Sequence, residues 1–183
     1  MALPPSAGAV RLVAIDGPAG SGKSTFADRL AAAFGDAPVI HTDDFASWDN
    51  QFDWFPRLLA QVIEPIAAGR AGRYRRYDWV ARELADWHDV PLVPVVIIEG
   101  VGAARREIAA ALSFTVWIET PTKLRLARGL ERDGDHMRDF WNRWIAGEVG
   151  HYATDRTRDR ADLIVDGNPS VAHDPDTEFV TLS

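Results

Sequence analysis

Short apolar runs rich in β-branched residues alternate along the chain with longer segments whose apolar residues recur every three or four positions. This alternation is typical of βαβ units, in which helices connect parallel strands. The five runs predicted to be strands are residues 10–15, 39–40, 93–98, 114–118 and 163–165. The third is apolar at successive positions, as in a strand covered on both faces. The pattern therefore predicts an α/β fold: a five-stranded parallel sheet with helices on both faces.

Three longer segments have the apolar spacing of a helix. Their apolar residues are, in order, Phe26, Leu30 and Phe34; the stripe within residues 54–66; and Met137, Trp141, Trp144, Ile145 and Tyr152. We expect the first helix to end near Gly35 and the second near Gly69, because glycine tolerates the backbone of a helix C-terminus. Pro65 is predicted to bend or shorten the second helix.

No internal repeat, low-complexity tract or linker divides the 183 residues. We therefore expect a single domain over residues 1–183, with the Pro- and Asp-rich tail beyond Gly167 wrapped along its surface. Apolar residues make up 46% of the chain and charged residues 26%. This balance allows a buried core and excludes the disordered and fibrous classes.

Composition and charge narrow the functional classes further. The net charge of −7 argues against nucleic acid or an anionic membrane as partners, because both require a basic surface. The chain has no cysteine and its five histidines lack metal-ligand spacing, which excludes disulfides and thiolate metal sites. The first residues lack the basic flank and apolar stretch of a secretion signal, and no apolar run is long enough to span a membrane. These features favour a cytoplasmic protein.

Residues 17–25, with the sequence GPAGSGKST, lie between a predicted strand and a predicted helix and match G-x-x-x-x-G-K-[ST]. Glycines let the backbone curl so that its N–H groups point at phosphate oxygens, and the helix presents its positive end to the same anion. Lys23, one of only two lysines, can reach the β- and γ-phosphates, and the Ser24 hydroxyl can ligate Mg²⁺. The motif predicts a P-loop NTPase fold that binds a nucleoside triphosphate. The predicted binding residues are Gly17, Ala19, Gly20, Ser21, Gly22, Lys23, Ser24 and Thr25.

Three predicted strands are followed by acidic residues, at the sheet edge where parallel sheets bind ligands. Asp43 and Asp44 follow the second strand, and Glu99 follows the third. Acids at these positions can hold Mg²⁺ or its water, so Asp43 and Glu99 are candidate metal ligands together with Ser24. A loop or capping role is the alternative for each acid. Asp16, inside the entry of the phosphate loop, is expected to support the turn.

Further motifs follow the phosphate loop in a fixed order. They are Asp43-Asp44-Phe45, Phe52-Asp53, Tyr77-Asp78, Glu99-Gly100 and the arginine-rich segment 125–133. This order resembles the uridine kinase family, whose relatives include pantothenate kinase and phosphoribulokinase, over about residues 10–167. The phosphate loop alone is specific only to a superfamily, whereas its combination with the acidic motifs after the second and third strands is more diagnostic.

The resemblance implies an ATP- and Mg²⁺-dependent kinase that transfers the γ-phosphoryl group to a hydroxyl acceptor. Asp43 matches the family's general base for that hydroxyl, and Glu99 matches the acid that holds magnesium with Ser24. Asp53 matches the acid that contacts the nucleoside sugar, and Tyr77 matches the tyrosine that lines the base pocket. Transfer depends mainly on alignment and charge neutralisation, so one acid near the acceptor, a metal and cations suffice.

Three arginines in the segment 125–133 are spaced three and four apart, so they share one face of a predicted helix. These are Arg125, Arg128 and Arg132. The resemblance implies that such arginines, together with Lys23, neutralise charge on the transferred phosphoryl group beneath a small lid at about residues 128–140. We take Arg128 and Arg132 as catalytic candidates. A solvated basic helix face is the alternative.

The acceptor side and the lid depart from the family pattern. Ala46 stands where the family has a tyrosine, Gly129 replaces an arginine, and Arg138 is the remaining lid cation. Arg82 lies near the place of a pocket histidine and is a candidate substrate residue. These changes spare the triphosphate site, so the sequence supports kinase chemistry better than it supports uridine as the acceptor.

Residues 45–90 are predicted to form an acceptor-side excursion. Four arginines and three aromatic residues within 69–79 could bind a flat or anionic substrate, and an exposed hairpin is the alternative. We expect four of the seven tryptophans near the acceptor cleft and three in the core; the four are Trp48, Trp54, Trp79 and Trp87, and the three are Trp117, Trp141 and Trp144.

Four functions are compatible with these observations. The first is a kinase for the 5′-hydroxyl of a nucleoside, and the second is a kinase for another hydroxyl metabolite, such as a vitamin precursor or a sugar. The third is a regulatory ATPase, and the fourth is a nucleotide-bound scaffold without turnover. A GTPase switch is disfavoured because the chain lacks an N-K-x-D motif. The expected partners are a nucleoside triphosphate and a small acceptor; the preference for ATP over GTP and the oligomeric state, a homo-oligomer included, stay open.

Overall fold

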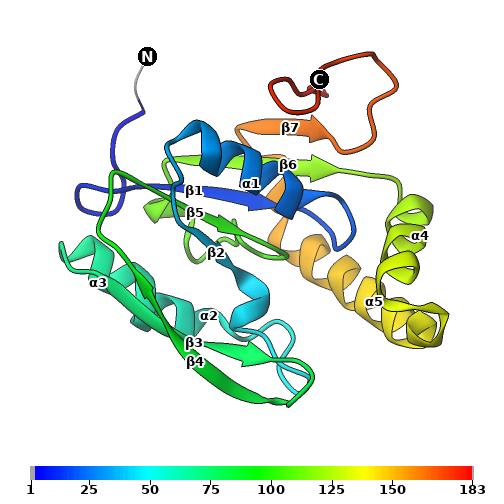
Figure 1. The fold of residues 1–183 in the computed structure, drawn as a ribbon, viewed down its shortest axis with the longest axis horizontal. Coiled ribbons are helices and arrows are strands. Elements are labelled where there is room, and N and C mark those ends of the chain that lie inside the picture. The colour runs from blue at the N-terminus through cyan, green and yellow to red at the C-terminus, as the bar shows by residue number, and fades with distance from the viewer. Residues whose placement is uncertain (1–2, 183) are drawn as a thin grey trace.

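The computed structural model describes residues 3–182 and contains a five-stranded, fully parallel sheet in the order β2-β5-β1-β6-β7 (Figure 1). Its strands are β1 (Arg11–Asp16), β2 (Val39–His41), β5 (Val95–Glu99), β6 (Phe114–Glu119) and β7 (Leu163–Asp166). All five predicted strands are confirmed, and their ends differ from the prediction by at most two residues.

Both faces of the sheet are buried, as the continuous apolar runs predict. In β1, Leu12 and Ala14 face one apolar cluster, and Val13 and Ile15 face the other. The first cluster also contains residues of the helical segment 55–67, and the second contains Ala27 and Ala31 of α1 (Lys23–Ala33). The alternation follows from the two-residue period of a strand, which points successive side chains to opposite faces.

The helix α1 ends as predicted, because Gly35 takes a left-handed backbone conformation with φ of +73°. Its apolar face is the expected one in part, because Phe26 and Leu30 pack against the second cluster. Ala27 and Ala31 are buried, whereas Phe34 is exposed. The small alanine side chains allow the helix to lie close to the sheet, and Phe34 follows the last helical residue, where it no longer faces the core.

The helical segment 55–67 consists of α2 (Phe55–Leu58), a π-helical turn (Leu59–Ile63) and α3 (Glu64–Ala67). The wide π turn ends two residues before Pro65, which has no N–H to donate and whose ring crowds the preceding turn. The predicted distortion at Pro65 is therefore confirmed. The segment ends near Gly69, which has φ of +71°.

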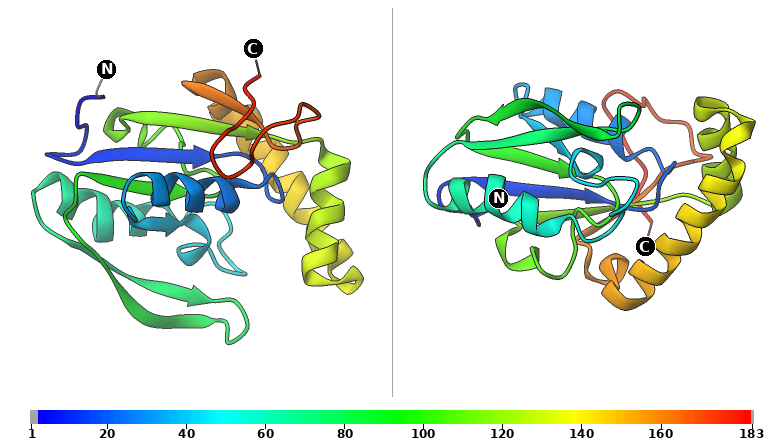
Figure 2. Two further views of the ribbon diagram at one scale, coloured as in Figure 1. Left: turned by 45° about the horizontal axis from the view of Figure 1, so that its top comes forward. Right: turned by 90° about the horizontal axis from the view of Figure 1, so that it is seen from below.

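The excursion contains an antiparallel hairpin, β3 (Gly72–Asp78) and β4 (Glu83–Val90), which lies beside the main sheet (Figure 2). The acceptor-side role of this segment stays a prediction, and the hairpin of the alternative is present. It is not fully exposed, because Tyr74 and Val90 belong to the apolar cluster beneath the helical segment. A shift of register between Arg75 and Tyr77 interrupts the two-residue alternation that would otherwise reveal β3 in the sequence.

The remaining helices follow β6. They are α4 (Thr122–Asp133), α5 (Arg138–Asp155) and α6 (Thr157–Arg160), and short 3-10 turns lie at Thr42–Asp44, Ala109–Ala111 and Asp135–Met137. Figure 1 shows α4 and α5 at the carboxyl end of the strands, beside the phosphate loop. The predicted lid region, residues 128–140, comprises the end of α4, a turn and the start of α5. Across residues 3–182, none of the helices has the length and apolar character needed to cross a membrane.

Candidate active site

The phosphate loop connects β1 to α1, and its backbone requires glycine. Gly20 has φ of +77°, and a Cβ atom there would lie 2.6 Å from the carbonyl oxygen of Arg125. Gly22 has φ of +101° and precedes α1 directly. At Gly20 the loop therefore lies tightly against α4, and at both positions the left-handed backbone favours a residue without a side chain.

Two side chains of the loop fit a bound anion. Lys23 is buried and its Nζ donates to the carbonyl oxygen of Pro18 at 3.0 Å, so it arches over the loop. The hydroxyl of Ser21 is buried and has no hydrogen-bond partner among the described residues. A buried hydroxyl without a partner is costly, and a phosphate oxygen would satisfy it.

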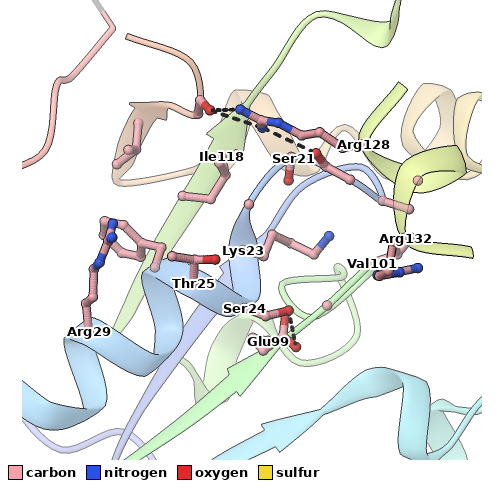
Figure 3. A pocket seen from close by; sticks show the side chains of 18 of the residues that line it. Ser21, Lys23, Ser24, Thr25, Arg29, Glu99, Val101, Ile118, Arg128 and Arg132 are labelled. Carbon is pink, nitrogen blue, oxygen red and sulfur yellow. Dashed lines mark hydrogen bonds between the residues drawn. The ribbon is translucent and has the colours of Figure 1, made fainter. Parts of the chain in front are cut away.

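Glu99, at the end of β5, lies next to the loop. The Ser24 hydroxyl donates to Glu99 Oε1 at 3.2 Å (Figure 3). Nδ1 of His41 lies 2.5 Å from the same oxygen. Burial alone would raise the pKa of Glu99, but the hydrogen bond from His41 and the charge of Lys23 outweigh it and lower that pKa. Glu99 is therefore held as a carboxylate beside Ser24.

The two neighbouring acids after β2 have different surroundings. Asp44 is buried and accepts a hydrogen bond from the Tyr74 hydroxyl at 2.8 Å, so it joins the turn to the hairpin. Asp43 faces the open cavity instead. Its pKa is raised because surrounding protein partly removes it from water, and Glu99 adds to this, while the positive charge of Lys23 opposes it.

A cavity of about 1320 Å³ brings these groups together. Residues 19–25, Asp43, Glu99, Arg128 and Arg132 all line it, and Figure 3 shows Lys23 and Arg132 directed into the same space as Glu99. Beyond Asp43, the wall is aromatic. It consists of Trp48, Trp79, Phe140, Trp141 and Trp144.

Four rings of the aromatic wall, those of Trp48, Trp79, Phe140 and Trp144, form a connected cluster. The centroids of Trp48 and Phe140 are 5.0 Å apart, and those of Phe140 and Trp144 are 5.9 Å apart. The indole N–H of Trp79 donates to the carbonyl oxygen of Asp43 at 3.1 Å. The wall is thus joined directly to the residue predicted to act as the base.

The oxygen atoms of Ser24, Asp43 and Glu99 fit Mg²⁺, which prefers such ligands. The described residues include no group of three or more His, Cys, Asp or Glu side chains that could hold a metal ion alone. A magnesium ion here would therefore need phosphate oxygens as further ligands, as is usual where Mg²⁺ accompanies a nucleotide.

Comparison with known proteins agrees with this geometry. The sequence profile of the Phosphoribulokinase / Uridine kinase family matches residues 41–171, which is more than half of the chain. The chain belongs to this family. Among curated proteins, the uridine kinase of Borrelia hermsii (strain HS1 / DAH) is 24% identical over 196 residues, covering 95% of this chain and 93% of the relative.

Solved structures share the fold of this family member. A "possible uridine kinase" from Bacillus stearothermophilus has a TM-score of 0.63 at 22% identity, covering 85% of this chain and 88% of the other. A "putative fructose transport system kinase" from Silicibacter sp. TM1040 has a TM-score of 0.58 at 25% identity, covering 83% and 85%. Membership of the family and the shared fold identify a P-loop kinase, and thus a phosphotransferase.

The arginines of α4 in this P-loop kinase separate into two groups. Arg128 and Arg132 line the cavity, and Arg128 also donates to the carbonyl oxygen of Gly167 at 3.2 Å. Arg125 is buried behind the loop, where it donates to the carbonyl oxygen of Ala19 at 3.1 Å. Arg125 thus supports the loop. The catalytic roles of Lys23, Arg128 and Arg132 stay predictions.

The candidate substrate residues lie outside the cavity lining formed by the described residues. Asp53 and Arg82 are exposed, and Arg82 stacks over the ring of Trp48 at 5.0 Å. Tyr77 is buried, with its ring edge-on to Trp79 at 5.4 Å. Arg82 and Tyr77 thus contact the aromatic wall, and their roles toward a substrate stay predictions, as does that of Asp53.

Two tryptophans occupy places other than those expected, and two others are buried as expected but also line the cavity. Trp54 is buried in the core beneath the excursion, because it begins the helical segment that covers the sheet. Trp87 is half-exposed on the hairpin, where Arg73 lies over its ring. Trp141 and Trp144 are the two buried rings that also line the cavity, and Trp144 lies on a face of α5 that packs toward Phe52 and Phe140.

Sequence reasoning did not single out Glu148, a buried acid of α5. Its Oε1 accepts hydrogen bonds from the backbone N–H of Ala19 at 2.6 Å and from the indole N–H of Trp144 at 2.8 Å. Its Oε2 pairs with Arg125 at 3.2 Å. The available signal was an acid at helical spacing within the apolar stripe of Trp141 and Trp144.

The expected supporting role of Asp16 is confirmed. Its buried carboxylate accepts hydrogen bonds from the backbone N–H groups of Gly17, Gly102 and Ala104 and from the Tyr152 hydroxyl, at 2.6–3.0 Å. These contacts join the loop entry to the segment after β5 and to α5. His41 was also not singled out from the sequence, although its place two residues before Asp43 puts it at the same sheet edge.

Proposed function

We propose that this P-loop kinase uses ATP and Mg²⁺ to phosphorylate a hydroxyl group of a small molecule, and that the acceptor is a nucleoside. One observation carries the proposal: a single cavity holds the phosphate loop, the carboxylate of Asp43 and a wall of aromatic rings. Donor and acceptor can therefore meet without a domain movement to bring separate sites together.

In this proposal the loop and the cations hold the donor in place. Backbone N–H groups of residues 20–24 and the Lys23 ammonium bind the β- and γ-phosphates, and Arg128 and Arg132 neutralise charge on the transferred group. Asp43 accepts the proton of the acceptor hydroxyl. At the same time the hydroxyl oxygen bonds to the γ-phosphorus, and the bond from the γ-phosphorus to the bridging oxygen of the β-phosphate breaks. Magnesium, held by Ser24 and Glu99, would supply charge neutralisation at the phosphates.

The aromatic wall supports a flat acceptor. Trp48 and Phe140 offer ring surfaces that stack on a heterocycle, and the curated relative from Borrelia hermsii is a uridine kinase. A sugar is the second candidate, since one structural neighbour is named a fructose transport system kinase. A sugar would also pack on aromatic rings, but its many hydroxyls need polar partners along the wall.

The test is a screen for ADP release with Mg²⁺ and ATP against nucleosides, sugars and vitamin precursors. Release stimulated by a nucleoside, with formation of the phosphorylated product, would support the proposal. Stimulation by a sugar alone would move the acceptor to the second candidate. ADP release that no acceptor stimulates would instead point to a regulatory ATPase. A cytoplasmic location stays a prediction from the sequence, and the oligomeric state stays open.

A further inference from the structure

The backbone of α4 does not require the glycine at position 129. Gly129 lies within the helix and has no positive φ, and glycine in a helix interior is destabilising relative to alanine. The requirement comes from α5 instead. A Cβ atom at Gly129 would lie 2.3 Å from Cζ2 of Trp141, so the indole ring occupies the space that any other side chain would need. Trp141 is 2% exposed, and its ring is therefore enclosed where the two helices meet.

The polar edge of the same ring holds an acid at the end of α4. The indole N–H of Trp141 donates to Asp133 Oδ2 at 3.0 Å. Asp133 also accepts two hydrogen bonds from Arg132, from Nε to Oδ1 at 2.7 Å and from Nη2 to Oδ2 at 3.0 Å. The hydrogen bonding from Arg132 holds the pKa of Asp133 below its usual value, and the bond from Trp141 acts in the same direction. Asp133 is therefore a carboxylate bound by both side chains.

The contact with Trp141 changes what this ion pair can do. The Arg132 side chain is 71% exposed, and an exposed ion pair alone is weak and leaves a long side chain free to change rotamer. Because Trp141 is fixed in the gap at Gly129, the carboxylate that it holds stays in one place. The guanidinium also lies over the indole, with Cζ 5.8 Å from the ring centroid. Arg132 thus has two attachments, and both depend on Trp141.

The attached guanidinium keeps one nitrogen for a ligand. Asp133 engages Nε and Nη2 of Arg132, whereas Nη1 has no hydrogen-bond partner among residues 3–182. Arg132 and Lys23 both line the cavity, and Figure 3 shows them directed into the same space. Donors that are already in place stabilise the charge on a transferred phosphoryl group best, because a misplacement of about 1 Å can cost a factor of about 10² in rate.

We propose that Trp141 is a positioning residue for phosphoryl transfer. Its ring fills the gap at Gly129, and its N–H holds Asp133, which in turn fixes Arg132 toward the transferred group. This inference rests on the proposed function in one respect, namely that Arg132 neutralises charge on that group. It gives the lid region a fixed corner, so that the donor does not have to order the arginine when it binds.

The test is a double-mutant cycle on the full chain. ADP release is measured with the acceptor that the screen identifies, for the parent chain, Trp141→Phe, Arg132→Ala and the variant with both changes. Trp141→Phe keeps an aromatic ring and loses the indole N–H, and we expect kcat to fall about tenfold while the KM for ATP stays within about twofold. In the Arg132→Ala background the same change should lower kcat less than about twofold, because Trp141 acts through the arginine.

Two further variants make the cycle specific. Trp87→Phe is the matched control, because Trp87 is a half-exposed tryptophan outside the described cavity lining, and it should leave kcat unchanged. Asp133→Asn weakens the attachment of Arg132 without altering the buried ring, and it serves if thermal unfolding shows that Trp141→Phe is damaged. We expect it to lower kcat as Trp141→Phe does, and again to have little effect once Arg132 is removed.

Three results would overturn the proposal. Unchanged kcat in both Trp141→Phe and Asp133→Asn would show that Arg132 does not need this attachment. Equal losses with and without Arg132 would reduce Trp141 to a structural role. Full activity of Arg132→Ala would refute the role proposed for that arginine and this inference with it.

A chain that phosphorylates no acceptor would refute the proposed function, and the inference is then decided by binding. Mg²⁺-ADP with aluminium fluoride mimics the transferred group, and Mg²⁺-ADP alone lacks it. We expect Trp141→Phe to weaken the aluminium fluoride complex about tenfold and Mg²⁺-ADP less than about twofold, measured by calorimetry. Equal weakening of both complexes, or of neither, would overturn the inference.

Discussion

The two halves of the cavity, the phosphate-loop half that we assign to the donor and the aromatic half that we assign to the acceptor, are built in different ways. The phosphate loop is one contiguous segment, residues 17–25, in which backbone groups supply most of the predicted contacts. Its glycines are required by their positive φ angles and, at Gly20, by close approach to α4. The aromatic wall comes from three separate regions: the loop before α2, the hairpin and α5. Phosphate binding, which is common to a superfamily, is therefore encoded by a short contiguous motif. The proposed acceptor surface depends instead on side chains from separate segments that the fold brings together.

The largest effect should come from the donor half. Lys23→Ala removes the ammonium group that lies over the loop, and we expect turnover to fall about 10³- to 10⁵-fold, with ATP binding weakened or lost. Lys123→Ala is the control. Lys123 is exposed on α4 and is not part of the described cavity lining, so its removal should leave turnover unchanged. Equal loss in both variants would contradict the assignment of the loop.

Substitutions of the two neighbouring acids after β2 test the point at which the two halves of the cavity meet. Asp43→Asn should reduce phosphoryl transfer about 10²- to 10⁴-fold while ATP binding is retained, because the amide cannot accept the acceptor's proton. Asp44→Asn should keep most of the transfer rate and lower the free energy of unfolding, because Asp44 bonds to buried Tyr74. Turnover and ATP affinity separate the two variants. Near-normal transfer by Asp43→Asn would show that another group is the base.

The main sheet could be predicted because each strand carries its own local signal. Residues 95–98 are apolar at successive positions, which only a strand covered on both faces requires. The hairpin carries a weaker signal, because the irregularity between Arg75 and Tyr77 breaks its alternation. Phe34 was wrongly predicted to lie on the apolar face of a helix, because the helical spacing continues one residue past the end of α1.

The donor half of the site was predictable for the same reason, and much of the acceptor half was not. Nothing local to Trp144 or Trp54 tells which ring faces a cavity and which is buried in the core. The contacts of Glu148 with Ala19 depend on a separation of 129 residues, so only the packing of α5 against the loop reveals them. Such contacts depend on which distant segments pack together in the fold. The order of these segments in the sequence does not say how close they lie in space.

Glu148 joins the two halves, so its replacement should affect both. Glu148→Ala removes the acceptor for Ala19 and Trp144 and leaves Arg125 buried without its partner. We expect the free energy of unfolding to fall by about 3 kcal/mol, measured by urea denaturation. Glu148→Gln keeps one carbonyl oxygen and should lose less. A loss below about 1 kcal/mol in the alanine variant would show that the halves are held together by other contacts.

The smallest effect should appear in the acceptor half alone. Phe140→Ala removes a ring that packs against Trp48 and Trp144, and we expect the KM for the acceptor to rise about tenfold while the KM for ATP stays within about twofold. Trp87→Ala is the control, because this half-exposed ring lies on the hairpin outside the described cavity lining. Unchanged acceptor KM in Phe140→Ala would remove the aromatic wall from recognition. An equal rise in both KM values would show that the wall stabilises the phosphate loop through Trp144 and Glu148, so that the two halves are not independent.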